Sequence, residues 1–211
     1  MNEIQEQVKA IKQSFRLLMD GKTAQSMRDK GVNYKLNWGA SLPMLREKAE
    51  ELRTLNAQRS TLYQLSIALW KEDVRECKIL ATMLMPSDEI LPEVVDIWME
   101  QMPSQELAEQ ASFNLFQHLP YAPQKAYEWM ASDKELYQLC GFLVLTRLFM
   151  NKQEPNERGI NEYIDQLEAA LQSPSLAVRK AAMQSVQLFA DLGLLYERLA
   201  QSVLKRQGMS L

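Results

Sequence analysis

The chain has 211 residues with a formal net charge of −3, and 24% of its residues are charged. This length fits one domain or two small ones, and the charge balance excludes a polycation, although it leaves a local basic patch open. No run approaches the roughly 18 apolar residues that a membrane span needs. The polar start of the chain has no secretory leader pattern, so we expect a cytoplasmic protein without a membrane partner.

The elements expected along the chain are helices, because Leu, Ala, Met, Glu, Gln and Lys dominate and only 7 residues are Gly. Breaks are expected at residues 20–33, 85–92, 101–105, 118–124, 151–159 and 172–175. Between them, apolar residues recur with a period near 3.6, which is typical of amphipathic helices.

Several of these helices follow one another as pairs. Residues 90–102 precede 104–119, residues 122–132 precede 134–150, and residues 160–172 precede 176–193. A pair of this kind recurs at roughly 35 to 40 residues and cannot bury both of its faces alone, so stacked neighbours must cover them. The pattern predicts an all-α, HEAT-like helical-repeat superhelix in a single domain, residues 1–211. An irregular helical bundle is the alternative.

Two helix starts are explicit in the sequence. Ser104 precedes Gln105 and Glu106, which predicts an N-cap followed by an acid in the first turn. Ser173 or Ser175, on either side of a proline, is expected to open the helix that begins near residue 176.

Residues for metal or cofactor chemistry are scarce. Cys77 and Cys140 each lie in an apolar helical pattern, so buried free thiols are expected and a disulfide is the alternative. His118 is the only histidine, and neither metal-ligand spacings nor glycine-rich phosphate loops occur. We expect no metal and no cofactor.

Three stretches resemble a known family. The segment YKLNWGASLPMLREKAEEL contains Tyr34, Gly39, Pro43, Leu45 and Arg46, which match an early family motif. The later segment LYQLSIALWKEDVRECKILATMLM matches a second motif at Leu69, Trp70, Arg75, Glu76, Ala81 and Leu84. Near the C-terminus, VRKAAMQSVQLFADLG resembles a third motif. Together they resemble the DNA alkylation repair family of AlkD-like glycosylases, from about residue 30 to 192.

This resemblance implies a fold and an activity. Family members are superhelices of HEAT-like repeats that bind duplex DNA in a concave groove and release 3- or 7-alkylated purines. A carboxylate near the sugar stabilises the oxocarbenium-like centre, and aromatic walls attract the cationic base.

The chemical positions of the family depart in this chain. The segment QELAE falls where the family has W-D-x-V-D, so Gln105 replaces an aromatic residue and Glu109 replaces the catalytic aspartate. The family's arginine falls on Leu139, and its late tryptophan falls on Gln184. Glu109 is therefore the candidate catalytic residue, and its extra methylene can displace the carboxylate by about 1 Å. A shift of one helical turn would bring Trp98 or Trp129 in as substitutes for the lost aromatics.

The candidate binding residues are those at the family's motif positions. They are Tyr34, Gln105, Arg179, Lys180 and Gln184. Arg179 and Lys180 match the family's RK pair and are the best candidates for a DNA contact, with plain helix surface as the alternative.

Other residues in the motifs favour structural roles. Arg46 and Glu76 are expected to form an ion pair between helices, and Trp38 and Trp70 are expected to pack in the core.

Charge is uneven along the chain. Residues 86–135 hold ten acidic residues against two lysines, whereas basic residues gather towards both ends. If the acidic span lines a groove it repels phosphates, and if it lies on outer faces it is ordinary solvated surface.

Three functions follow from these patterns. The first is a DNA-binding relative of the family whose glycosylase chemistry is absent or altered. The second is an active alkylpurine glycosylase that uses Glu109. The third is a scaffold that binds a protein partner in its concave groove.

Overall fold

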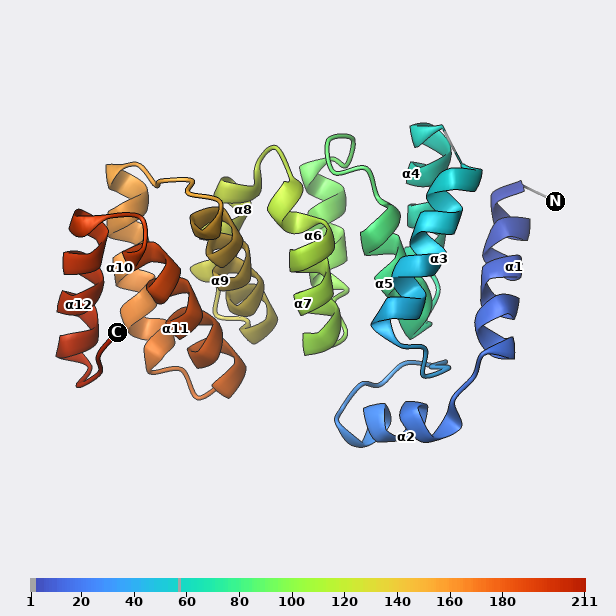
Figure 1. Cartoon of the computed structure of the whole chain (residues 1–211), viewed down its shortest axis with the longest axis horizontal. Helices are drawn as coiled ribbons and strands as arrows, with labels where there is room; N and C mark the ends of the chain where they lie inside the picture. Colours follow the sequence, from blue (N-terminus) through green and yellow to red (C-terminus); the bar gives the residue numbers. More distant parts are fainter. Residues whose placement is uncertain (1–2, 57) are drawn as a thin grey trace. The chain divides into compact units, whose positions relative to one another are not determined.

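The computed structural model describes residues 3–56 and 58–211. Within these residues the secondary-structure elements are all helices (Figure 1). The prediction of an all-α protein is confirmed. None of the helices in these residues has the length and apolar character needed to cross a membrane. The chain forms two compact units, Met1–Leu119 and Pro120–Leu211, while the prediction of one domain over residues 1–211 stays a prediction.

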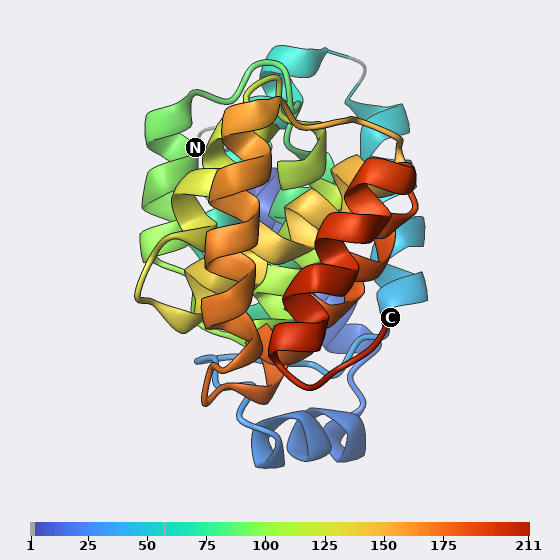
Figure 2. The ribbon, with the colours of Figure 1, turned by 90° about the vertical axis from the view of Figure 1, so that its left-hand side faces the viewer.

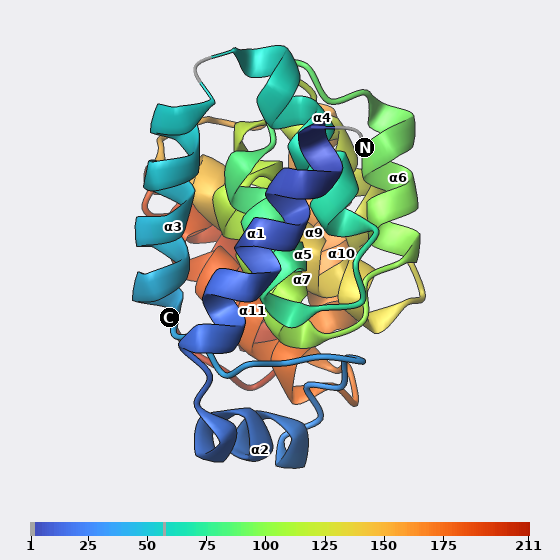
Figure 3. The same cartoon turned by 90° about the vertical axis from the view of Figure 1, so that its right-hand side faces the viewer.

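The first unit is built around one buried helix, α5. The helices of this unit are α1 (Glu3–Leu17), α2 (Gly21–Asp29), α3 (Leu42–Leu55), α4 (Arg59–Trp70), α5 (Arg75–Leu84), α6 (Pro92–Glu100), α7 (Gln105–Asn114) and the short 3-10 helix η1 (Phe116–His118). All residues of α5 are buried, because α3, α4 and α7 pack around it (Figure 3). Helix α2 lies beyond the lower ends of α1 and α3 in both Figure 1 and Figure 3.

The second unit is centred on α9. Its helices are α8 (Ala122–Met130), α9 (Glu135–Met150), α10 (Glu157–Leu171), α11 (Leu176–Ala190) and α12 (Leu194–Arg206). Helix α9 packs against α8 and α11, and α12 lies beside α10 and α11 (Figure 2). Gly141 allows the close approach of α8, because a Cβ at this position would lie 2.6 Å from the backbone nitrogen of Met130.

Most expected boundaries agree with the structure. The three predicted pairs correspond to α6 with α7, α8 with α9, and α10 with α11. Ser104 and Ser175 are the N-caps of α7 and α11, and each hydroxyl accepts from a backbone N–H three residues later. Cys77 and Cys140 are buried and free of disulfides.

The expected break at residues 20–33 was wrong in part, because it contains α2. The Asp20 carboxylate caps this helix by accepting from the backbone N–H groups of Lys22 and Thr23. An aspartate followed by a glycine is typical of a turn, but the same side chain can satisfy the free N–H groups of a helix start, as Asp20 does here.

A buried ionic network joins the segment before α3 to the start of α5. One Glu76 carboxylate oxygen accepts from the backbone N–H groups of Trp38 (3.1 Å) and Ala40 (3.2 Å) and from Arg75 Nη1 (3.4 Å). Arg75 Nη1 also donates to the carbonyl of Ala40 at 2.8 Å. The expected ion pair between Arg46 and Glu76 was wrong: Glu76 is buried and one of its carboxylate oxygens bonds to Arg75 and to this segment, whereas Arg46 is exposed.

Gly39 lies in the same segment and has a φ of 77°, which favours glycine. A Cβ here would lie 2.5 Å from the carbonyl oxygen of Asp20, and the backbone N–H of Asp20 donates to the carbonyl of Trp38 at 2.9 Å. The segment therefore fits tightly between the start of α2 and the start of α5.

We expect Glu76→Ala to lower the free energy of unfolding by about 3 kcal/mol, because two backbone donors and the buried Arg75 lose an acceptor. Glu76→Gln keeps an acceptor oxygen and should cost less than Glu76→Ala. Urea unfolding followed by circular dichroism measures both. The exposed Arg46→Ala is the control and should change stability by less than about 0.5 kcal/mol. A loss below about 1 kcal/mol for Glu76→Ala would contradict this account of the network.

Candidate functional site

The start of α7, where the sequence predicted the reactive site, is held rigidly. Ser104 caps the helix, with its hydroxyl oxygen 3.3 Å from the backbone nitrogen of Leu107. The Glu106 carboxylate accepts from Arg75 in a two-point contact, from Nε at 2.8 Å and from Nη2 at 2.6 Å. This geometry is the strong form of an arginine–carboxylate pair. The network that fixes residues 38–40 therefore also fixes the first turn of α7.

Tyr34 lies against this helix start. Its hydroxyl is 3.1 Å from the Ser104 hydroxyl oxygen, and burial raises the pKa of Tyr34 to about 12. The structure thus brings Tyr34 and the QELAE segment together, although they are 70 positions apart in the sequence. The hydroxyl is already used in structure, and the phenol stays protonated at neutral pH.

Glu109 and Gln105 face solvent on the outer side of α7. The Gln105 side-chain amide donates to the Glu109 carboxylate at 2.8 Å, and both residues are exposed. A carboxylate stabilises a cationic transition state best in a site from which water is excluded. Exposure to solvent weakens this effect at Glu109.

The four tryptophans are all buried in the two cores. Trp70 and Trp98 stack with ring centroids 4.1 Å apart, and the ammonium of Lys78 lies 4.7 Å from the Trp70 ring centroid. Trp98 and Trp129 were considered as substitutes for the lost aromatic walls, but this expectation was wrong because their rings pack in the interior. The core roles expected for Trp38 and Trp70 are confirmed.

One aromatic residue near Glu109 was missed. Phe113 lies four residues after Glu109 on α7 and is 42% exposed. Residues four apart lie on one face of a helix, so Gln105, Glu109 and Phe113 form a continuous stripe. The spacing of four residues between Glu109 and Phe113 is visible in the sequence and indicates that both lie on one face of the helix.

The remaining candidates lie in the second unit, on α11. Arg179 is half-buried, and its Nη1 donates to the backbone carbonyls of Ser173 and Pro174, so it holds the loop that leads into the helix. Lys180 and Gln184 are exposed and four residues apart, hence on one face. Leu139, at the family's arginine position, is buried in α9.

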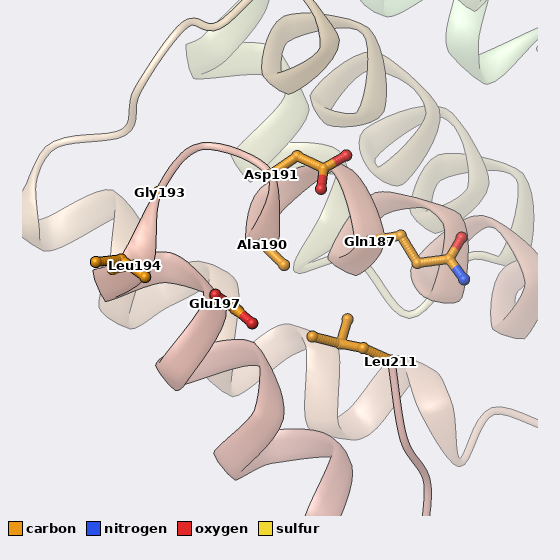
Figure 4. Close-up of a pocket in the computed structure, with 7 residues that line it drawn as sticks. All are labelled: Gln187, Ala190, Asp191, Gly193, Leu194, Glu197 and Leu211. Carbon is orange, nitrogen blue, oxygen red and sulfur yellow. The ribbon is translucent and has the colours of Figure 1, made fainter.

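A pocket of about 560 Å³ opens beside the end of α11 and the start of α12 (Figure 4). Asp191 and Glu197 lie on its wall, together with Gln187 and the C-terminal Leu211. Two carboxylates repel a phosphate, so this pocket does not favour DNA binding.

The comparisons with known proteins decide the family. A family model described as "DNA alkylation repair enzyme" matches residues 11–191. The chain belongs to this family. No curated protein matches the chain. A solved structure described as "A new family of proteins related to the HEAT-like repeat DNA glycosylases with affinity for branched DNA structures" is similar over 94% of this chain and 82% of its own. Its TM-score is 0.77 at 14% sequence identity, so it shows the fold.

The HEAT-like repeat fold predicted from the helix pairs is therefore confirmed. The alternative prediction, an irregular helical bundle, is not confirmed. Three residues of the motifs that resemble the family build the frame of the first unit. Gly39 permits the close approach of backbones, and Arg75 and Glu76 bind the segment before α3.

We expect the stability of the first unit to fall as pH rises from about 10 to 12, partly because of Tyr34. Burial raises its pKa in the folded state from the ordinary 10.0 to about 12, so this group favours folding below pH 10 and its contribution is lost as pH rises towards 12. Tyr34→Phe removes the titrating group and should make the fall shallower. Urea unfolding at pH 9 and pH 11 measures the difference. An equal fall in the variant and the parent protein would show that Tyr34 titrates normally.

Proposed function

We propose that this protein binds DNA and does not excise bases at the position of Glu109. The observation that carries the proposal is the pairing of Gln105 with Glu109 on an exposed helix face while all four tryptophans are buried. Excision of a cationic purine needs aromatic faces around the base and a carboxylate in a water-excluded site. Around Glu109 the tryptophan faces are buried, the exposed Phe113 offers one smaller ring, and the carboxylate is not shielded from water.

The frame supports a binding role because it keeps the first turn of α7 in one geometry. Arg75 and Glu106 hold this turn, and Tyr34 contacts its capping residue. A rigid surface binds without the entropic cost of ordering its side chains.

The acidic span is less repulsive in the first unit than its sequence indicates. Arg59 forms ion pairs with Asp88 and Glu89, and Arg75 pairs with Glu106. These acids are therefore partly neutralised, which makes the basic residues on other faces of the unit more important for a polyanionic partner.

The similar solved structure represents proteins described as having affinity for branched DNA. Branched substrates therefore belong beside duplex DNA among the candidate partners of this chain. A protein partner in the groove of the repeat is the alternative.

We expect the purified protein to release neither 7-methylguanine nor 3-methyladenine from methylated duplex DNA, and Glu109→Gln to behave in the same way. In parallel, it should bind duplex and branched oligonucleotides with an affinity that falls as salt rises. Base release is measured by chromatography, and binding by fluorescence anisotropy at two salt concentrations.

The outcomes separate the three functions. Release that disappears in Glu109→Gln would establish an active glycosylase and overturn the proposal. Salt-sensitive binding without release supports it. If the protein neither releases bases nor binds any of the DNA substrates, a protein-binding scaffold becomes the better interpretation.

The two basic residues of α11 should behave differently. Lys180→Ala should reduce the slope of log K against log salt by about 0.9, as expected for one lost phosphate contact, and leave stability unchanged. Arg179→Ala should instead lower the free energy of unfolding by about 1 kcal/mol, since two loop carbonyls lose a donor. Anisotropy and urea unfolding of both variants measure these effects, and an unchanged slope for Lys180→Ala would remove α11 from the DNA-binding surface.

A further inference from the structure

A basic pocket lies in the first unit, away from the start of α7. Its volume is about 620 Å³, and it opens between α1 and the extended segment that precedes α3. The lining residues are Lys9, Lys12, Gln13, Arg16, Leu36 and Trp38. This volume falls in the range of pockets that hold a small organic ligand.

The cations of the pocket come from one face of α1. Lys9, Lys12 and Arg16 follow the spacing of three and four residues that places side chains in a row along a helix. The neighbouring face of α1 carries the buried residues Ile4, Val8, Ile11 and Phe15, which hold the helix in the core. The packing of α1 therefore fixes the row of Lys9, Lys12 and Arg16 along the side of the helix that lines the pocket.

Two of these cations are available to a ligand. Lys12 is used already, because its ammonium lies 2.6 Å from the Glu72 carboxylate. Lys9 and Arg16 are exposed, and neither forms an ion pair with a carboxylate in residues 3–56 and 58–211. An anion at the rim of the pocket would thus meet two unneutralised positive charges.

The wall opposite α1 is apolar. Leu36 is 42% exposed even though its backbone is fixed, with its N–H bonded to the carbonyl of Asp73 at 3.2 Å and its carbonyl to the N–H of Arg75 at 3.1 Å. Trp38 lies beside it and its backbone N–H is bonded to Glu76. Because the network at Arg75 and Glu76 fixes this wall, the apolar surface exists before any ligand binds.

We propose that this pocket binds one nucleotide of an unpaired DNA strand. Lys9 and Arg16 bind its phosphate, and the exposed Leu36 contacts the base or sugar. The proposal rests on the proposed DNA binding and extends it to a site that involves neither Glu109 nor α11.

An unpaired nucleotide fits this chemistry better than a base pair. In a duplex the base faces are stacked on one another, so only phosphates could reach the pocket and the apolar wall would stay exposed. An unpaired nucleotide offers a phosphate and an apolar base face together. Such nucleotides occur where strands separate, as at forks and other branches.

The test compares three labelled DNAs of one sequence by fluorescence anisotropy: a blunt duplex, a fork with unpaired arms, and a single strand. We expect the parent protein to bind the fork and the single strand more tightly than the duplex. Lys9→Glu with Arg16→Glu should weaken fork binding at least 10-fold and remove the preference over duplex. Lys9→Ala with Arg16→Ala should reduce the salt slope for single strands by about 0.7, as expected for the loss of one phosphate contact.

A second variant isolates the apolar wall. Leu36→Ala should weaken binding to the fork by about 3- to 10-fold and leave the salt slope unchanged, since it removes contact area and no charge. The matched control is Arg46→Glu with Lys71→Glu, which makes the same change of charge at two exposed positions of the same unit. This control should keep the preference for the fork.

The experiment distinguishes failure of the pocket proposal from failure of the proposed DNA binding. If the parent protein binds the fork and the Lys9/Arg16 reversal binds it equally well, the pocket is not a nucleotide site, although the proposed DNA binding stands. If the parent protein binds none of the DNAs, both proposals fail.

A further experiment tests the other polyanionic partner for this pocket, which is a membrane surface. Leu17, Leu18 and Met19 follow Arg16 and are exposed, a combination that also suits an anionic membrane. Flotation with vesicles of phosphatidylserine and phosphatidylcholine tests it. Vesicle binding that the reversal abolishes, with DNA binding unchanged, would assign the pocket to a lipid headgroup and overturn the proposal.

Discussion

The buried pair of Arg75 and Glu76 is the constraint on which the first unit depends. Both side chains lie inside the protein, where an unpaired charge is costly, so their hydrogen bonds must be made. Glu76 holds the backbone of residues 38 and 40, and Arg75 reaches the carbonyl of Ala40 and the carboxylate of Glu106. One ionic network therefore sets the wall of the α1 pocket and the first turn of α7 at the same time.

This network explains why the fold could be predicted from the sequence and the site could not. Helix periodicity follows from which residues are apolar, so the pairs from α6 to α11 were found with nearly correct boundaries. The matching motif residues were also informative, since Gly39, Arg75 and Glu76 have partners that only this backbone arrangement provides. The partner expected for Glu76 was nevertheless wrong, because residue types do not say which of several nearby arginines approaches a carboxylate.

The candidate site was harder because exposure decides its chemistry. The sequence places Glu109 where a catalytic aspartate is expected, but whether the carboxylate is shielded from water depends on neighbours that are distant in sequence. Likewise, the number of tryptophans does not say where their rings lie. The rings of Trp70 and Trp98 stack on each other. The basic pocket was missed for the same reason. Lys9 and Arg16 line a pocket only because the fold places Leu36, 20 positions beyond Arg16, opposite them.

A frame that keeps its geometry while its reactive positions change separates two roles that a glycosylase combines. Excision needs the aromatic residues at the surface, around the flipped base, whereas binding needs only cations and a surface of fixed shape. In this chain the tryptophans stabilise the cores, and the unneutralised cations of α1 lie beside an apolar wall that the same core holds in place. Aromatic residues buried in the core cannot stack on a base without loss of stability. The burial of the tryptophans and the fixed shape of the pocket beside α1 therefore depend on the same core.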